Sequence, residues 1–167
     1  DWEAITAEAE GLAMEGPPDV GATVDGFQLQ RLIADGRYTR LFLARDVIGD
    51  LGQVALKFPK PAVVSARGAR QAFLREAFIG RRIDNPFVGR VLTLEAGRQS
   101  RLYIVQPFYA GQTLHARLAD DGPLEIAEGV GVALRLARAV AALHRAGVIH
   151  RDIKPDNVIL EANGGLK

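Results

Sequence analysis

Apolar and polar residues alternate in three short stretches between residues 27 and 58, and this alternation predicts three β-strands. The stretches read FQLQRLIA, RLFLARD and QVALKF, with a turn at Asp35-Gly36 between the first two. Farther along, FVGRVLTLEAGRQSRLYIVQPF predicts a hairpin of two more strands with Gly97 in its loop. The chain is therefore expected to build a small sheet of five strands.

Helical spacing of apolar residues appears between and after these strands. Residues 65–83 predict a helix for which Ser65 is the candidate N-cap, and GQTLHARLAD predicts a short helix. Residues 125–147 predict a long helix that ends at Gly147. One apolar face of this helix is expected to comprise Ile126, Val130, Leu134, Ala137 and Ala141. A β-rich part with one helix thus precedes a helical part, which predicts the α+β fold class.

Composition narrows the class of protein. The chain has 167 residues, of which 48% are hydrophobic and 25% are charged, as in one globular domain or a domain with a tail. It contains no cysteine, which excludes disulfides and thiolate metal sites. No apolar run approaches the roughly 18 residues of a membrane span, and the acidic start DWEAITAEAE differs from a signal peptide. We expect no membrane segment in this chain and a cytoplasmic location.

The charges are unevenly distributed along the chain. Residues 1–25 contain seven acidic residues and no Lys or Arg, whereas the remainder contains 21 basic and 13 acidic residues. Because GPPDVGATVDG is rich in turn-forming residues, we interpret residues 1–25 as an acidic, solvated linker or tail. The arginines of the remainder are scattered without a basic run, so we expect no nucleic-acid partner.

The densest group of chemically active side chains is HRDIKPDN, from His150 to Asn157. The carboxylate of Asp152 can accept a proton from an attacking hydroxyl, and the amide oxygen of Asn157 can ligate Mg²⁺. Lys154 can neutralise phosphate charge. Phosphoryl transfer requires these groups, because its transition state is stabilised mainly by positioning and charge.

This stretch resembles the catalytic loop of the protein kinase family, in which Asp152 would be the catalytic base. Lys154 followed by Pro155 is similar to the serine/threonine-specific form of that loop, which implies a protein substrate with a Ser or Thr hydroxyl. The resemblance extends upstream to VALK, where Lys57 would contact the α- and β-phosphates of ATP. Glu76, in FLREAF, would be the helix glutamate that pairs with Lys57.

The glycine-rich loop departs from the family pattern. Ala34, Gly36 and Thr39 occupy the three glycine positions, so Gly36 alone retains a glycine. Since glycine lets backbone N–H groups approach phosphate closely, we expect a stiffer cover and weaker nucleotide binding. The resemblance implies that the ATP-binding residues are Ile33, Gly36, Leu41, Ala55, Lys57, Gln106, Tyr109 and Ile159, with Asn157 as a ligand of Mg²⁺.

The same resemblance divides the chain into residues 1–25 as the tail, 26–106 as a kinase N-lobe, and 107–167 as the hinge and a partial C-lobe. The aspartate of the D-F-G motif is expected about two to five residues beyond Lys167, going by motif order in the family. We therefore expect a fragment that is inactive alone. The amino-acid sequence of the β-rich part is also similar to the sequences of bacterial proteins that carry a phosphatase domain before the kinase.

Two other functions remain open at this point. A pseudokinase that binds nucleotide or acts as a scaffold would suit the altered glycine loop, although Lys57, Asp152 and Asn157 argue against it. A small-molecule phosphotransferase of kinase-like fold is the second alternative, and the RDIKP form of the loop argues against that function.

Overall fold

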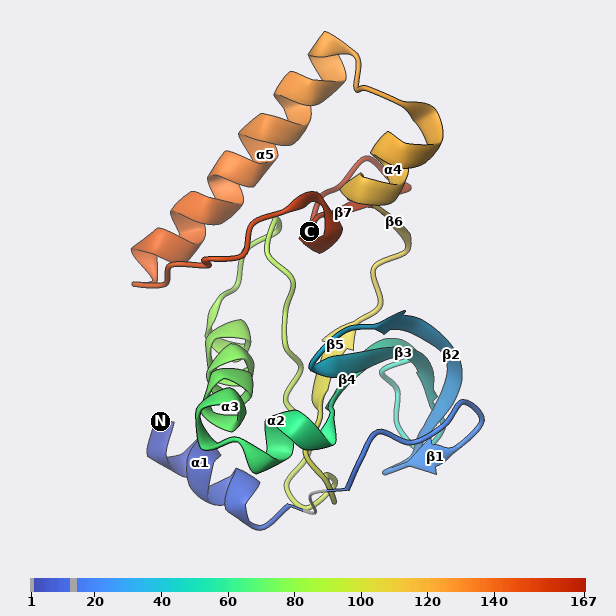
Figure 1. Cartoon of the computed structure of the whole chain (residues 1–167), viewed down its shortest axis with the longest axis vertical. Coiled ribbons are helices and arrows are strands. Elements are labelled where there is room, and N and C mark those ends of the chain that lie inside the picture. The colour runs from blue at the N-terminus through green and yellow to red at the C-terminus, as the bar shows by residue number, and fades with distance from the viewer. Residues whose placement is uncertain (1, 13–14) are drawn as a thin grey trace. The chain divides into compact units, whose positions relative to one another are not determined.

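The computed structural model describes residues 2–12 and 15–167, and it divides them into two compact units (Figure 1). The first unit contains the residues up to Arg82 together with Arg90–Phe108. The second contains Ile83–Gly89 and Tyr109–Lys167. None of the helices in the described ranges is long and apolar enough to cross a membrane.

The first unit is built on an antiparallel sheet of five strands in sequential order. The strands are β1 (Thr23–Val24), β2 (Phe27–Asp35), β3 (Thr39–Asp46), β4 (Gln53–Pro59) and β5 (Ile104–Pro107). Strands β2, β3 and β4 lie where the alternating pattern predicts them. Together with the helices described below, this sheet confirms the predicted α+β fold class.

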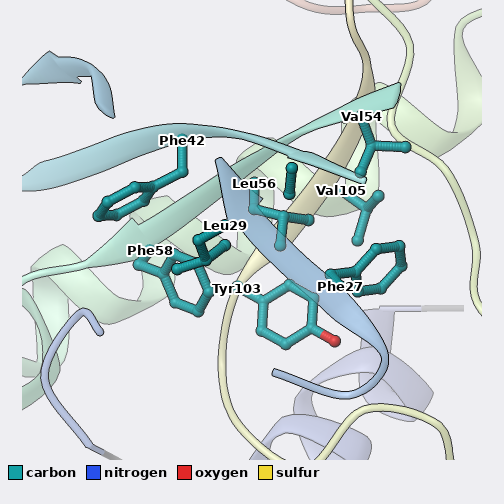
Figure 2. Close-up of a cluster of buried hydrophobic side chains, with 9 residues drawn as sticks. Phe27, Leu29, Phe42, Val54, Leu56, Phe58, Tyr103 and Val105 are labelled. Atoms are coloured by element: carbon teal, nitrogen blue, oxygen red, sulfur yellow. The ribbon is translucent and has the colours of Figure 1, made fainter. Parts of the chain in front are cut away.

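One face of the sheet carries the larger hydrophobic core (Figure 2). Successive side chains of a strand point to opposite faces, so β4 contributes Val54, Leu56 and Phe58 to this core. Ala55 and Lys57 consequently lie on the opposite face. Strand β5 alternates likewise: Val105 packs in this core, whereas Ile104 packs in a second core.

The second core lies under three helices, α1 (Trp2–Glu10), α2 (Pro61–Ser65) and α3 (Arg67–Arg82). The predicted helix over 65–83 forms as α3, which begins two residues later than expected, but Ser65 ends α2 and does not cap α3. Its hydroxyl instead donates to the carbonyl of Pro61 at 3.0 Å, at the end of α2. The prediction of a solvated N-terminal segment is also corrected, since Ala9 of α1 is only 3% exposed.

The predicted hairpin before the end of the first unit forms only in part. Its second strand is β5, but residues 91–95 are not a strand. The backbone N–H of Leu92 donates to the carbonyl of Val105 at 2.8 Å, and the pairing goes no further as a regular ladder. The sheet reaches five strands because β1 pairs with β2, at the sheet edge that the sequence pattern did not reveal.

The second unit contains β6 (Gly111–Thr113), α4 (Leu114–Asp121), α5 (Ile126–Arg145), the 3₁₀ turn η1 (Pro155–Asn157) and β7 (Ile159–Glu161). The hydroxyl of Thr113 caps α4 by accepting from the N–H of Ala116 at 3.1 Å. Strand β7 pairs with β6, and Ile159 and Lys167 exchange backbone hydrogen bonds of 2.8 and 3.0 Å. Leu166 also forms an isolated β-bridge with Leu160.

The apolar face predicted for α5 is present, but it is not the face that the described residues bury. The helix has the expected length, and Gly147 follows it with a φ of 73°. However, its buried residues are Val132, Ala139 and Leu143, while Ile126 is 86% exposed. The helix presents two apolar stripes, and the stripe through Val132 is the one that packs toward Val158 and Leu166.

Candidate functional site

The first part of the candidate site is the ion pair between Lys57 and Glu76. Lys57 projects from β4 on the face opposite the large core, and Glu76 projects from the exposed side of α3. The ammonium of Lys57 donates to both carboxylate oxygens of Glu76, at 2.7 and 2.8 Å. Their side chains are 26% and 43% exposed, so the pair is accessible to solvent and to a ligand. The structure thus joins the two residues that the sequence paired across 19 positions.

Three of the nucleotide-binding candidates share a sheet face with Lys57. Leu41 of β3 lies directly opposite Lys57 in the strand register, and Gln106 of β5 lies directly opposite Ala55. Residues in register across antiparallel strands point to the same face. The sheet therefore gathers Leu41, Ala55, Lys57 and Gln106 into one surface, with apolar side chains beside a cation.

Ile33 and Gly36 lie at the β2–β3 hairpin. Ile33 falls at an irregularity of the ladder, between the register pairs of Leu32 and Ala34. Gly36 forms the turn, where its N–H donates to the carbonyl of Thr39 at 2.9 Å. The hairpin is also tied to the end of β4, because the N–H of Lys60 donates to the carbonyl of Tyr38 at 2.8 Å.

A charged cluster at this hairpin escaped the sequence analysis. Asp35 contacts the ammonium of Lys60 at 2.5 Å and the guanidinium of Arg40 at 3.4 Å. The hydrogen bond from Lys60 lowers the pKa of Asp35 below its ordinary value. The signal in the sequence was an acidic residue beside Gly36 in a loop that should cover phosphates, followed by a lysine just beyond β4. Both cations partly neutralise the negative charge of this carboxylate.

The second part of the candidate site is the loop from His150 to Asn157. The side-chain amide of Asn157 donates to the carbonyl oxygen of Asp152 at 2.8 Å and to its carboxylate at 2.9 Å. The ammonium of Lys154 lies 3.4 Å from the same carboxylate. The loop therefore brings together the three residues to which the sequence assigned phosphoryl-transfer chemistry.

These contacts determine the protonation of Asp152. The hydrogen bond from Asn157 is the main cause that lowers the pKa of Asp152 below its ordinary value, and Lys154 adds to it. The carboxylate is consequently ionised at neutral pH and can accept a proton. Its side chain is 63% exposed, so a hydroxyl from outside can reach it.

Backbone geometry shapes the loop. Arg151 has a φ of 65°, which is unusual for a residue with a side chain. The N–H of Asp152 donates to Nδ1 of His150 at 3.3 Å, a contact within the loop itself. Pro155 opens the η1 turn, and Asn157 closes it. The loop thus directs Asp152 and Asn157 toward each other by local means.

The remaining candidates belong to the second unit. Tyr109 is half-buried, and the ammonium of Lys167 lies 5.2 Å from the centre of its ring. Ile159 begins β7 in register with Thr113. The predicted site residues are therefore distributed as Ile33, Gly36, Leu41, Ala55, Lys57, Glu76 and Gln106 in the first unit, and Tyr109, Asp152, Lys154, Asn157 and Ile159 in the second.

Comparison with known proteins identifies the family of the chain. Residues 27–167 match the protein kinase domain family. The chain belongs to the protein kinase family. Its kinase region includes both the Lys57–Glu76 pair and the Asp152 loop.

Several relatives of this chain are named serine/threonine-protein kinases. It is 29% identical over 150 residues to the serine/threonine-protein kinase PrkC of Bacillus subtilis, covering 89% of this chain and 23% of PrkC. It is 33% identical over 143 residues to CBL-interacting protein kinase 4 of Oryza sativa, covering 84% of this chain and 31% of the relative. The chain therefore spans less than a third of the length of either protein.

A solved structure shows the same fold. The Mycobacterium tuberculosis PknI kinase domain superposes with a TM-score of 0.74 at 26% sequence identity. The match covers 89% of this chain and 59% of that one. The kinase-like fold predicted from the sequence is thus confirmed over most of the chain.

Proposed function

We propose that this chain is the ATP-binding and catalytic-loop part of a protein kinase that phosphorylates Ser or Thr hydroxyls of proteins. The observation that supports this most strongly is the bidentate contact of Lys57 with Glu76, at 2.7 and 2.8 Å. A lysine held by a helix carboxylate is positioned to receive phosphate oxygens without moving. Such positioned charge is the main source of catalysis in phosphoryl transfer.

Each residue has a distinct role in the proposed reaction. Lys57 binds the α- and β-phosphates of ATP, while Leu41, Ala55 and Ile159 contact the adenine. The substrate hydroxyl attacks the γ-phosphorus, the bond to ADP breaks, and the hydroxyl proton passes to a carboxylate oxygen of Asp152. Lys154 offsets the negative charge that develops on the transferred phosphoryl group.

The donor atoms also suit Mg²⁺, which prefers oxygen ligands. The side-chain nitrogen of Asn157 is engaged by Asp152, so the amide oxygen of Asn157 is the atom that would hold the ion. When bound, Mg²⁺ neutralises phosphate charge. RDIKP favours a protein substrate, because Lys154 and Pro155 follow the serine/threonine-specific pattern.

The first test is calorimetric titration of the chain and of its Lys57→Met variant with Mg·ATP. The second test measures phosphoryl transfer to Ser/Thr peptides, and its enzyme is the longest protein that contains this chain. We expect Lys57→Met to weaken Mg·ATP binding. Asp152→Asn should preserve binding and lower transfer by about 10²- to 10⁴-fold, the usual contribution of a general base.

Three outcomes would overturn the proposal. Unchanged ATP binding and hydrolysis in Lys57→Met would remove the role of this lysine. Tight Mg·ATP binding without transfer would assign a pseudokinase. Transfer to aminoglycosides but not to peptides would assign a small-molecule phosphotransferase.

A further inference from the structure

The acidic N-terminal segment packs against α3, the helix that carries Glu76 (Figure 1). The rings of Trp2 and Phe78 meet edge to face with their centres 5.7 Å apart. The guanidinium of Arg70 donates to the carbonyl of Ala9, in the last turn of α1, at 3.1 Å. Leu12 packs beside Ala9 against the second core.

Charge complementarity supports this packing. The sequence of α3 contains five arginines and a single acidic residue, Glu76, whereas residues 1–25 contain seven acidic residues and no basic one. Two ion pairs follow α1: Glu15 with Arg101, and Asp19 with Arg40 at 3.9 Å, where the second is at the surface and contributes little. Acidic residues of the N-terminal segment therefore form ion pairs with arginines elsewhere in the first unit.

The contact lies on the side of α3 away from the ion pair. Phe78 follows Glu76 by two residues, which at about 100° per residue places them about 200° apart around the helix. Arg70 lies within about 80° of Phe78 by the same count. The N-terminal segment thus contacts one side of α3, while Glu76 contacts Lys57 on the opposite side of the same helix.

The rest of α3 is held by apolar contacts. Phe73, Leu74 and Ala77 are buried in the second core, and Gly80 lies against Val91. None of these contacts covers Phe78, which is only half-buried. Trp2 and the cation of Arg82, 5.0 Å from the ring centre, are the groups seen against it in the described residues.

We propose that residues 2–12 and 15–19, here called the N-terminal strap, hold α3 in the position at which Glu76 reaches Lys57. Trp2 is then a positioning residue that acts through Glu76. The strap is activating, because the ion pair is formed while the strap is docked. The effect on nucleotide binding rests on the proposed function, whereas the effect on α3 does not.

The first experiment measures amide hydrogen exchange in Trp2→Ala, with Trp2→Phe as the conservative rescue. Ala7→Gln is the matched control, since Ala7 lies on the exposed side of the same helix. We expect faster exchange in α3 for Trp2→Ala, unchanged exchange in β3 and β4, and recovery in Trp2→Phe. Unchanged exchange in α3, or equal acceleration throughout the sheet, would overturn the proposal.

The second experiment tests whether Trp2 acts through Glu76. An aromatic pair of this geometry contributes enough that its loss should weaken Mg·ATP binding about fivefold. In a Glu76→Gln background, Trp2→Ala should weaken binding less than about twofold on the same scale, because the linked contact is already gone. If Trp2→Ala still weakened Mg·ATP binding about fivefold in the Glu76→Gln background, Trp2 would not act through Glu76.

A third measurement uses Trp2 as a reporter, since it is the only tryptophan in the chain. Arg70→Gln should undock the strap and shift the Trp2 emission to longer wavelength, while Arg70→Lys should shift it less. An unchanged spectrum in Arg70→Gln would contradict the docking role of Arg70. Failure of Lys57→Met to weaken Mg·ATP binding would sink the proposed function, but it would leave the exchange and fluorescence results standing.

Discussion

The Lys57–Glu76 pair and the Asp152–Asn157 pair bring charged and polar groups together by different routes. Lys57 and Glu76 are separated by 19 residues and come from a strand and a helix. Asp152 and Asn157 are separated by five residues of one loop. The first pair therefore depends on how α3 packs on the sheet, and the second depends on local backbone geometry.

This difference implies different sensitivities. A change in the packed core of the first unit should move or loosen the Lys57–Glu76 pair without affecting the loop. A change in the loop should alter Asp152 without affecting the sheet, because the second unit has its own core around Val132, Val158 and Leu166. The following variants test this separation.

The largest effect is expected from Phe58→Ala. Phe58 is 1% exposed, with ring centres 5.2 Å from Tyr103 and 5.9 Å from Phe42. Loss of a buried phenylalanine lowers the free energy of unfolding by about 4 kcal/mol, and urea unfolding followed by NMR should show this loss in the first unit. Ile48→Ala is the control, since Ile48 is 70% exposed. Equal loss of signals from the loop between His150 and Asn157 would refute the separation.

A matched pair of glycines in α3 gives the next effect. An added Cβ at Gly80 would overlap the Val91 side chain, whereas one at Gly68 meets nothing within 4 Å. Gly80→Ala should lower the free energy of unfolding by about 1 kcal/mol, since overpacking outweighs the gain in helix propensity. Gly68→Ala should raise it by roughly 0.5 kcal/mol. Similar thermal shifts in both variants would contradict close packing at Gly80.

Asn157→Ala should change the titration of Asp152. The folded pKa of this carboxyl is lowered, so its stabilising contribution is present above the ordinary pKa and is lost as pH falls through the lowered one. Removing the Asn157 amide should move the midpoint upward, which carboxyl ¹³C NMR can measure. Asp156→Asn removes a neighbouring negative charge and should move the midpoint slightly downward or not at all. A downward shift in Asn157→Ala would be inconsistent with the observed hydrogen bond.

The smallest effect is expected at Arg151. Its φ of 65° costs about 1 kcal/mol for a residue with a Cβ, so Arg151→Gly should stabilise the second unit by roughly 0.5 kcal/mol after the entropy cost of glycine. Arg151→Ala keeps the strain and should give no gain. Guanidinium unfolding of the unchanged chain, Arg151→Gly and Arg151→Ala would measure these differences in stability. An Arg151→Gly variant less stable than Arg151→Ala would argue against backbone strain at this position.

Local patterns account for what the sequence predicted correctly. Strands β2, β3 and β4 follow from period-two alternation, and the contacts of the loop between His150 and Asn157 follow from residues that are close in sequence. The buried face of α5 did not follow, because its sequence offers two apolar stripes and only the tertiary partner selects Val132 over Ile126. The Asp35–Lys60 contact and the docking of Trp2 on Phe78 also depend on distant partners, which one sequence does not reveal.

Strand β4 has packing demands on both faces: its residues are buried except for Gln53, which is exposed, and Lys57, which is half-buried. A library of substitutions selected only for stability should therefore reject most changes across the strand while accepting Met at position 57. The same library selected for phosphoryl transfer should reject that methionine. A position at which the two selections disagree separates the chemistry of a protein from its architecture, and in this strand we expect that position to be 57.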